Sequence, residues 1–524
     1  MMEVKWLGIP AVMVFSIVLI KGQVNKSAVE GYKKTGIAEV KNDRGKLLAN
    51  RYCGSCHLVP EPGLLDKKTW RDGVLPNMGW RLGIRTGGKS PYDDMDPEEA
   101  AAVKLTGVYP EEPALSAEDW KLILAYYEKE APEQMPVRQT RDSVYSGLPL
   151  FTSSLTFIAG HKAPKTTLLK FDKQTSRLYV GDDQNSLYVL NSRQEVEETW
   201  WMDSAPVDID FPENGIPRVL TIGSIAPSEQ RKGRWMTLSK EKESSGVNIK
   251  NLPRPVRFYT ADLNGDGVED VLFCGFGHHS GKLFWYEGMN AEKEHVLKDL
   301  PGARKVVIQD LNGDNRPDLV ALMTQAREEI VAFYNQGNGN FREVSLLQFP
   351  AVYGMTHFEL TDMNGDGFPD ILATNGDNWD LSPVLKDYHG IRIFLNNGRN
   401  QFKESWFYPL YGAGKAVAAD FDGDGDMDIA AVSFYTDLDN PEHGFIYLSN
   451  EGNMSFKGYS TPEAAAGKWL TMEVADIDSN GTPDIVLGSY FQNFGEMTRF
   501  MFRGVTEFPQ LLILKNISVA RKKP

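Results

Sequence analysis

The nonapeptide DMNGDGFPD at residues 362–370 decides the fold of this 524-residue chain. Side chains that carry oxygen occupy its positions 1, 3, 5 and 9, and glycine at position 6 permits the left-handed backbone of a tight loop. The motif recurs as DLNGDGVED (262–270), DLNGDNRPD (310–318), DFDGDGDMD (420–428) and DIDSNGTPD (476–484). Successive copies begin 48, 52, 58 and 56 residues apart. This spacing predicts a repeated structural unit of propeller-blade size, and we number the segments acidic loops 1 to 5 in chain order.

The residues around each acidic loop indicate β-strands on both sides. An apolar run follows every ninth-position aspartate, as in VLF (271–273) and ILA (371–373). A further apolar run and an Asn/Gly turn come later in the unit, for example at residues 391–402. An EF-hand would need a glutamate at position 12 and flanking helices. Position 12 is instead occupied by Phe273, Ala321, Ala373, Ala431 and Leu487.

The acidic loops offer the oxygen ligands that Ca²⁺ prefers. Six to eight oxygens in a flexible arrangement suit Ca²⁺ better than Mg²⁺. The side chains at positions 1, 3, 5 and 9 and the backbone carbonyl at position 7 supply such a set, which predicts up to five Ca²⁺ ions. The alternative is an Asp/Gly turn without an ion. The predicted ligands are Asp262, Asn264, Asp266, Val268, Asp270, Asp310, Asn312, Asp314, Arg316, Asp318, Asp362, Asn364, Asp366, Phe368, Asp370, Asp420, Asp422, Asp424, Asp426, Asp428, Asp476, Asp478, Asn480, Thr482 and Asp484.

These signatures resemble FG-GAP/VCBS repeats, the integrin-α-type β-propeller family, over residues 149–520. The resemblance implies calcium between the two inner strands of a blade, with the acidic loops on one face of the propeller. Two degenerate units around Asp172 and Asp208 precede the five motifs and lack the oxygen set. We therefore expect a mainly β, seven-bladed propeller whose first two blades bind no metal.

A second register lies five residues before the first aspartate of the first four acidic loops. It contains Arg257, Lys305, His357 and Lys415. If each of these residues begins an innermost strand, the four side chains ring the mouth of the central channel on the face opposite calcium. Such a ring favours an anionic ligand, whereas the alternative is that charged residues simply mark exposed strand starts.

The pentapeptide CGSCH at residues 53–57 predicts covalent attachment of a c-type haem. Cys53 and Cys56 have the spacing that thioether bonds to the two haem vinyl groups require, and His57 is the proximal iron ligand. A zinc site would need four ligands, and only Cys274 remains elsewhere. A disulfide is the other alternative. For the sixth position we predict Met78, with Met95 second, because a thioether ligand stabilises Fe(II).

The surrounding segment, residues 40–131, resembles a small class I cytochrome c domain. It is expected to contain an opening helix with Leu47, Leu48 and Tyr52, the haem motif, a methionine loop and a closing helix capped by Ser116. The resemblance implies a small all-α domain in front of the propeller. Residues 132–148, which contain two prolines and a glycine, are expected to form a linker.

The N-terminus and the net charge restrict the location and the partners. Residues 6–20 carry no charge and follow Lys5, which predicts a signal peptide or a membrane-anchoring signal within residues 1–25. The rest of the chain is then exported to the periplasm or another extracytoplasmic space. The formal net charge of −15 argues against a nucleic-acid partner, because a polyanion is repelled.

The leading functional hypothesis is an exported electron carrier whose propeller binds a redox partner protein or a small-molecule substrate. One alternative is a periplasmic oxidoreductase in which the propeller holds a small molecule, such as a sugar, and the haem accepts its electrons. Another is an adhesion or scaffold protein with a haem sensor. No catalytic residue is predicted, and the sequence does not determine the oligomeric state.

Overall fold

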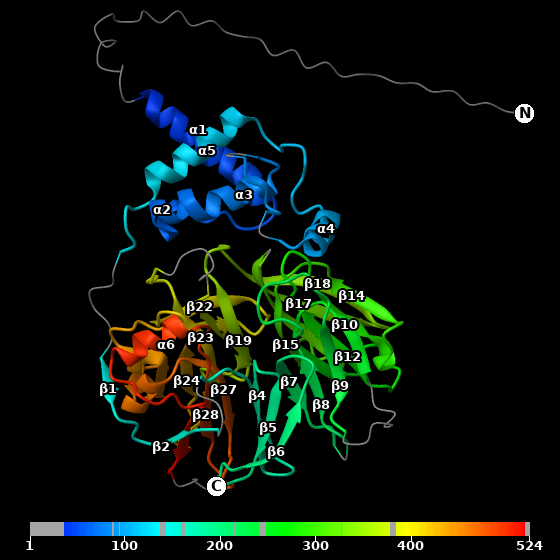
Figure 1. The fold of residues 1–524 in the computed structure, drawn as a ribbon, viewed down its shortest axis with the longest axis vertical. Helices are drawn as coiled ribbons and strands as arrows, with labels where there is room; N and C mark the ends of the chain where they lie inside the picture. The colour runs from blue at the N-terminus through cyan, green and yellow to red at the C-terminus, as the bar shows by residue number, and fades with distance from the viewer. Residues whose placement is uncertain are drawn as a thin grey trace, which may run out of the picture.

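Seven β-sheets follow one another along the chain in the computed structural model (Figure 1). The structure describes residues 36–85, 88–93, 95–136, 143–158, 163–213, 215–239, 248–325, 327–377 and 384–518. The first four sheets contain β3 (Thr166–Asp172), β4 (Arg177–Asp182), β5 (Ser186–Leu190), β6 (Val196–Trp201), β7 (Pro206–Asp210), β8 (Arg218–Thr221), β9 (Gly233–Thr237), β10 (Asn248–Leu252), β11 (Pro255–Ala261), β12 (Asp270–Gly275), β13 (Lys282–Tyr286), β14 (Glu294–Lys298), β15 (Ala303–Gln309), β16 (Asp318–Thr324), β17 (Glu328–Gly337) and β18 (Asn340–Phe349).

The last three sheets contain the remaining repeats and two strands from the start of the propeller. Their members are β19 (Met355–Thr361), β20 (Asp370–Asn375), β21 (Gly390–Asn396), β22 (Phe402–Pro409), β23 (Ala413–Ala419), β24 (Asp428–Ser433), β25 (Phe445–Asn450), β26 (Phe456–Ser460), β27 (Trp469–Ala475), β28 (Asp484–Ser489), β29 (Leu511–Asn516), β1 (Val144–Ser146) and β2 (Phe151–Thr156). Helix α6 (Phe494–Met501) lies between β28 and β29.

The first strands of the seven sheets form a closed ring. Strand β3 contacts β7, and the contacts continue through β11, β15, β19, β23 and β27, which returns to β3. This arrangement is a seven-bladed β-propeller with one sheet per blade, which confirms the predicted fold. The two degenerate units are blades 1 and 2, and acidic loops 1 to 5 belong to blades 3 to 7.

Burial decreases from the middle of each blade outward. All six residues of β12, β20, β24 and β28 are buried, whereas exposed and half-buried residues alternate along most of an outer strand such as β14. Second strands are packed on both faces against neighbouring blades, so their sequences are continuously apolar after the first aspartate. The hydrophobic clusters accordingly join residues of adjacent blades, such as Trp285 of blade 3 and Phe333 of blade 4.

Strand β2, from the start of the propeller, closes the ring. It pairs antiparallel with β29 and becomes the outermost strand of blade 7, whose other strands come from the end of the chain. The Phe151 ring lies 5.6 Å from that of Phe421 and 5.4 Å from that of Tyr447, both in blade 6. Residues 144–146 of the expected linker form β1, which pairs in parallel with β26 on the edge of blade 6.

The N-terminal helical region, residues 36–130, consists of short helices around one cluster of buried residues. Its elements are α1 (Gly36–Tyr52), η1 (Cys53–Ser55), η2 (Pro62–Leu64), α2 (Lys67–Thr69), η3 (Trp70–Val74), α3 (Leu75–Arg81), α4 (Pro97–Thr106) and α5 (Ala117–Glu130). Helices α1 and α5 approach closely at Gly45, where a Cβ atom would lie 2.4 Å from the carbonyl oxygen of Leu122. Ser116 caps α5 as predicted, because its Oγ accepts a hydrogen bond from the Asp119 N–H.

One element differs from the expected helical architecture. Met78 lies within α3 and not in a loop, since Pro76 stands in the first turn of that helix and the chain continues helical to Arg81. The predicted signal segment, residues 1–25, lies outside the described residues. Among the described helices, none is both long enough and apolar enough to cross a bilayer.

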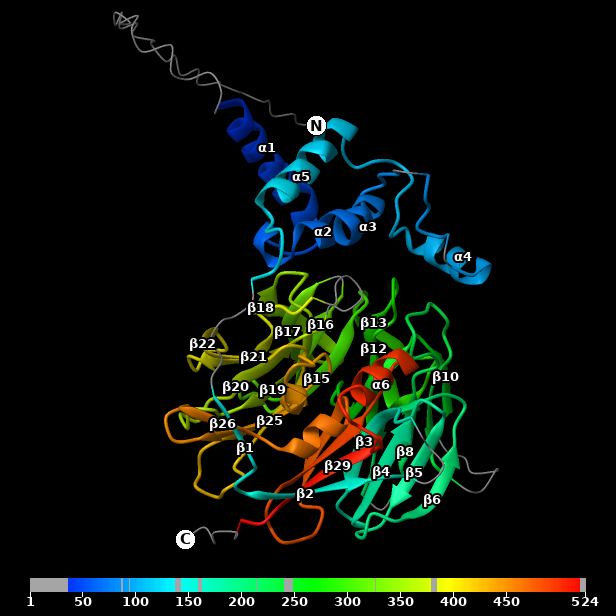
Figure 2. The ribbon, with the colours of Figure 1, turned by 60° about the vertical axis from the view of Figure 1, so that its left-hand side comes forward.

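The helical region sits on the propeller face opposite the acidic loops (Figures 1 and 2). Loops after first strands lie at one end of a meandering blade, and loops after second and fourth strands lie at the other. The contacts with the helices come from the second group. Arg327 donates from the β16–β17 loop to the Cys56 carbonyl oxygen at 3.1 Å, and Val352 of the β18–β19 loop joins the buried cluster of the helical region.

We predict that Phe151→Ala destabilises the propeller by about 3–5 kcal/mol, because it leaves a cavity where β2 closes the ring. The matched control is Thr152→Ala, an exposed neighbour on the same strand, with an expected effect within about 0.5 kcal/mol. Guanidinium unfolding of the full chain measures both. Superimposable curves for Phe151→Ala and the wild type would contradict the closing role of β2.

Candidate functional site

The acidic loops connect the first and second strands of blades 3 to 7 on one face of the propeller. Their ninth-position aspartates are the first residues of β12, β16, β20, β24 and β28, and each is at most 1% exposed. Burying a carboxylate is costly unless hydrogen bonds compensate for the lost water. The ninth-position aspartate is therefore the structural centre of each loop.

Both oxygens of this buried aspartate accept backbone hydrogen bonds. In loop 2, Asp318 Oδ2 accepts from the Leu311 N–H at 3.0 Å, and Oδ1 accepts from the Asn335 N–H on the third strand at 2.7 Å. Loops 3, 4 and 5 repeat this pair of bonds, and in loop 1 the second donor is the Gly288 N–H, two residues beyond the end of β13. Burial raises the pKa of these aspartates, and in Asp428 it raises the pKa to about 6. Each aspartate ties its loop to the third strand of the same blade or, in loop 1, to the residues just after that strand.

The first-position aspartate folds the tip of each loop. In loop 3, the Asp362 carboxylate accepts hydrogen bonds from the N–H groups of Gly365, Asp366 and Gly367. In loops 1 and 2 the equivalent bonds, led by those from Gly267 and Asn315, lower the pKa of Asp262 and Asp310. These carboxylates are ionised at neutral pH and lie near the surface, as a cation site requires.

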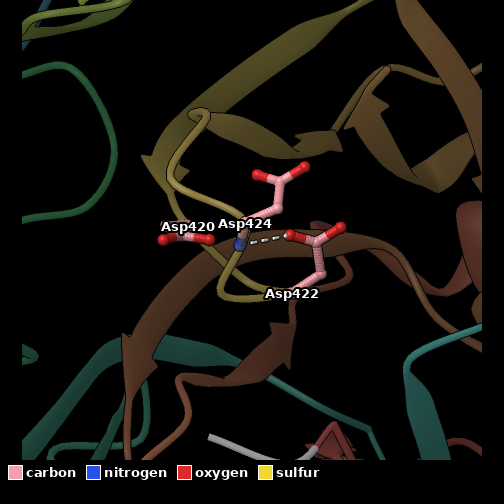
Figure 3. A group of neighbouring side chains, drawn as sticks. All are labelled: Asp420, Asp422 and Asp424. Carbon is pink, nitrogen blue, oxygen red and sulfur yellow. Dashed lines mark hydrogen bonds between the residues drawn. The ribbon is translucent and has the colours of Figure 1, made fainter. Parts of the chain in front are cut away.

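Two loops bring three carboxylates close together. In loop 4, ligand oxygens of Asp420, Asp422 and Asp424 lie within 4.8 Å of one another, and in loop 5 the same holds for Asp476, Asp478 and Asp484 (Figure 3 shows loop 4). The Asp424 N–H donates to Asp422 Oδ1 at 3.0 Å, the bond drawn in Figure 3. Loops 1 to 3 have asparagine at position 3 and so lack the third-position carboxylate that loops 4 and 5 share. The oxygen sets of loops 4 and 5 fit a hard divalent cation.

Loop 2 differs from the others in carrying its own cation. The Arg316 guanidinium, at position 7, forms an ion pair with Asp314 and also donates to the Asn335 carbonyl oxygen. This ion pair neutralises one of the predicted calcium ligands. Loop 2 therefore offers a cation less negative charge than its sequence alone indicates.

Two asparagines near the ends of third strands join neighbouring blades. The Asn335 side-chain amide donates to the Leu263 carbonyl oxygen of blade 3 at 2.9 Å, and Asn516 donates to the Phe421 carbonyl oxygen of blade 6 at 2.8 Å. The sequence predicts an Asn/Gly turn near the end of the third strand, at a variable distance from the acidic loop. It does not indicate that the partners of these amides lie on other blades.

The cysteine motif follows α1, on the side of the helical region that meets the propeller. Cys53, Cys56 and Cys274 are all free, and burial raises the pKa of Cys53 to about 11. His57 Nδ1 lies 2.8 Å from the Leu58 carbonyl oxygen. A carbonyl oxygen only accepts, so Nδ1 carries the proton and Nε2 keeps its lone pair. This arrangement is typical of histidines that bind metal ions.

The two candidate methionines occupy different surroundings. Met78 packs, together with Cys53 and Leu82, against the buried cluster that contains Trp70 and Tyr127. Met95 is half-buried in the segment before α4 and is not part of this cluster. The structure therefore brings Met78 into the same hydrophobic environment as the first cysteine.

A further set of contacts joins the helical region to blades 2 and 3. The Glu229 N–H donates to Glu99 Oε1 at 2.9 Å, while the Glu229 carboxylate accepts from the His279 and Ser280 N–H groups. The rings of Tyr109 and His279 meet edge to face, 5.4 Å apart. Burial lowers the pKa of His279 to about 4, so this histidine is neutral at physiological pH. With Arg327 and Val352, these contacts extend over blades 2 to 5.

The predicted basic register lies on the innermost strands. Arg257, Lys305, His357 and Lys415 are the third residues of β11, β15, β19 and β23, each just after a register irregularity. Lys305 Nζ and His357 Nε2, on adjacent blades, lie 2.8 Å apart. The acidic loop begins five residues beyond each of these positions, so the basic residues are nearer to the end of the channel that faces the helices.

Comparisons with known proteins identify the repeats. The FG-GAP-like repeat matches residues 262–321, 310–373 and 374–431. Integrin alpha-4 from Xenopus laevis is 27% identical over 177 residues, and the match covers 30% of this chain but only 17% of that relative. Among solved structures, the N-terminal domain of Nup159 matches 71% of this chain and 97% of its own, with 10% identity and a TM-score of 0.42. The Neurospora crassa Pan2 WD40 domain matches 72% and 100%, with 9% identity and a TM-score of 0.41.

We predict that Asp318→Asn destabilises blade 4 by about 1–3 kcal/mol even in the presence of a chelator. An amide has only one acceptor oxygen, so one of the two buried N–H groups loses its partner. Asp299→Asn, an exposed aspartate without such bonds, is the control and is expected to unfold like the wild type. Denaturant unfolding measures both. If the two variants are equally stable, the aspartate does not tie the loop to the third strand.

Proposed function

We propose that this propeller with FG-GAP-like repeats belongs to an exported electron-transfer protein with a covalently attached c-type haem. Cys53 and Cys56 would hold the haem through thioether bonds, His57 would be the proximal ligand and Met78 the sixth ligand. When bound, haem supplies reversible one-electron oxidation and reduction of its iron. The propeller would bind the partner or substrate that exchanges electrons, and calcium would stabilise its acidic loops.

The geometry of His57 is the observation that carries this proposal. Its Nδ1–H is held by a backbone carbonyl next to it, which fixes the tautomer and leaves Nε2 as a neutral ligand atom. The two thiols form no disulfide, and the Cys56 Sγ lies 3.6 Å from the Ser55 Oγ. Zinc would need two further N or S ligands. Cys274 is buried in β12 of the propeller and does not supply one.

The surroundings of Met78 support this residue, rather than Met95, as the sixth haem ligand. A haem needs an apolar cleft, and Met78 shares the buried cluster with Cys53, whereas Met95 does not. The helical position of Met78 holds its backbone firmly, so only the side-chain rotamer would adjust to reach the iron. His/Met ligation gives a high reduction potential, which suits a carrier that receives electrons.

The carboxylate groupings support structural calcium. Three carboxylates within 4.8 Å of one another repel unless a cation is present, and two loops show this grouping. Because the ninth-position aspartate fastens each loop to its own blade, a bound cation would rigidify the tip of that loop. We propose up to five Ca²⁺ ions, with loop 2 the weakest because Arg316 neutralises Asp314.

The docking of the helical region supports a coupled role for the two parts. The Cys56 carbonyl oxygen accepts from Arg327 on the propeller face, so the haem motif lies at the contact between the two parts. A molecule bound to that face would be close to the attached haem. Export is the remaining element of the proposal and depends on the apolar segment at residues 6–20.

The same contact favours a second candidate function, a periplasmic oxidoreductase. In this case the propeller would oxidise a small molecule, such as a sugar, and the haem would accept the electrons. One experiment distinguishes the electron carrier from the oxidoreductase. Sugars and alcohols are added anaerobically to the purified oxidised protein, and the reduced-haem absorption band is followed. Reduction by a substrate alone supports the enzyme, and its absence across the panel supports the carrier.

We predict that the protein, produced in a host that attaches c-type haem, has a mass increased by one haem. Cys53→Ala and Cys56→Ala together abolish this increase, because no thioether bond can form. Cys274→Ala, which removes the buried propeller thiol, leaves the increase intact. Mass spectrometry measures the mass of the wild type and of the variants. An apoprotein mass for the wild type would contradict the haem proposal.

The sixth ligand has its own prediction. Met78→Ala should remove the low-spin spectrum of His/Met ligation, because the iron loses its thioether ligand, while Met95→Ala should retain that spectrum. Absorption and magnetic circular dichroism spectra of the oxidised protein measure the difference. The opposite pattern would assign the ligand to Met95.

We predict that thorough chelation lowers the melting temperature of the full chain. A site filled at 100 times its dissociation constant contributes about 2.7 kcal/mol, which chelation removes. Asp420→Asn with Asp422→Asn should abolish the contribution of loop 4. Asp426→Asn, whose position offers only its backbone carbonyl, is the control in the same loop. Elemental analysis without bound calcium, together with an unchanged melting temperature, would reject the calcium assignment.

A further inference from the structure

The central channel of the propeller is lined by charged side chains from several blades. The innermost strands carry the cationic residues Lys170, Arg257, Lys305 and Lys415 and the carboxylates of Asp208, Glu359 and Glu473, with Arg257 and Lys305 on neighbouring strands. Such strands expose one edge of unpaired backbone N–H groups to the channel. The positive and negative side chains have different roles at this edge.

The carboxylates are already engaged by the backbone. Asp208 Oδ2 accepts from the Phe258 N–H, Glu359 Oε2 from the Ala418 N–H and Glu473 Oε1 from the Phe171 N–H. Each acceptor belongs to the blade that precedes its donor, and the bond from Glu473 to Phe171 joins blade 7 to blade 1. These three residues therefore satisfy the inner strand edges and join adjacent blades.

The cations, in contrast, retain unused donors. Within the described part of the chain, Arg257 uses only Nη1, which donates to Asp208 Oδ1 at 2.9 Å, although a guanidinium has five N–H donors. Lys415 Nζ donates to the Met472 carbonyl oxygen at 2.7 Å and forms no ion pair with a described carboxylate. The other three cations each lie beside one carboxylate, so Lys415 is the excess positive charge.

His357 adds another donor to this group. The ammonium group of Lys305 can only donate, so in its charged form it donates to His357 Nε2, and the ring proton is then on Nδ1. His357 is 8% exposed, and its Nδ1 has no hydrogen-bond partner among the described residues. Donors thus outnumber available acceptors in this part of the channel.

The cations also lie close together and within reach of solvent. The pKa of Lys305 is lowered to about 7, mainly by burial. The positive charges of Lys415 and Arg257 contribute to this lowering. The Arg257 and Lys305 side chains nevertheless keep 40% and 21% of their surface accessible. Because both residues are on innermost strands, this accessible surface faces the channel.

We propose that the central channel binds one small oxyanion, a carboxylate or inorganic phosphate, between Arg257, Lys305 and Lys415. Acceptor oxygens would satisfy the unused N–H donors, and the negative charge would offset the repulsion among three gathered cations. The site is nearer to the end of the channel beneath the helical region. It depends on neither the haem nor the calcium ions of the proposed function.

Calorimetric titration of the full chain with sodium phosphate, and separately with sodium acetate, tests this site in dilute Tris chloride buffer. We expect saturable binding of one anion, and the tighter of the two probes identifies the class. Lys415→Met and Lys305→Met should each weaken binding at least tenfold. Lys173→Met removes the same charge from an exposed turn of blade 1 and should bind like the wild type.

Lys415→Arg keeps the positive charge and should bind within about threefold of the wild type, which separates lost charge from lost packing. Circular dichroism and thermal melting establish that each variant is folded, and Lys305→Met serves alone if Lys415→Met does not fold. Two results would overturn the proposal. One is the absence of saturable binding of either anion by the folded wild type, and the other is unchanged affinity in the folded lysine-to-methionine variants.

Discussion

The structure depends on a buried carboxylate accepting two backbone hydrogen bonds at the start of each second strand. In blades 4 to 7 this aspartate accepts one N–H from the acidic loop and one from the third strand, and in blade 3 the second N–H is that of Gly288 just beyond the third strand. Three segments of a blade are thus held at one point. A carboxylate without these donors would be expensive to bury, and a loop without the carboxylate would leave two buried N–H groups unpaired. The carboxylate and the two N–H groups therefore satisfy one another, which explains why aspartate occupies the ninth position of every motif.

The blades are joined by the same kind of bond. Side-chain amides at the ends of third strands donate to carbonyl groups of the preceding blade, as Asn335 does to Leu263. At the centre, Asp208, Glu359 and Glu473 accept N–H groups from the following blade. Apolar clusters fill the space between these polar joints. The propeller is therefore fixed at its rim and its channel by directional bonds, and between them by packing.

The two faces of the propeller carry different chemistry as a result. The acidic loops gather carboxylates on one face, and the opposite face receives the helices through Arg327, Val352, Glu229 and His279. The cationic part of the channel is nearer to the second face, where the cysteine motif also lies. A face rich in carboxylates and a channel rich in N–H donors are thus separated by the length of a first strand.

The sequence by itself determined the repeated unit, the seven blades, the capped closing helix and the positions of the cysteine motif and acidic loops. These features are local, because loop chemistry and strand periodicity act over a few residues. The tertiary structure decided the rest. Closure of the ring by β2, the ion pair of Arg316 with Asp314, the helical position of Met78 and the partners of Asn335 all depend on packing or on contacts that local patterns leave open. The clustering of Arg257, Lys305 and Lys415 likewise needs the ring to close, because residues 48 and 110 positions apart meet only when seven strands surround one channel.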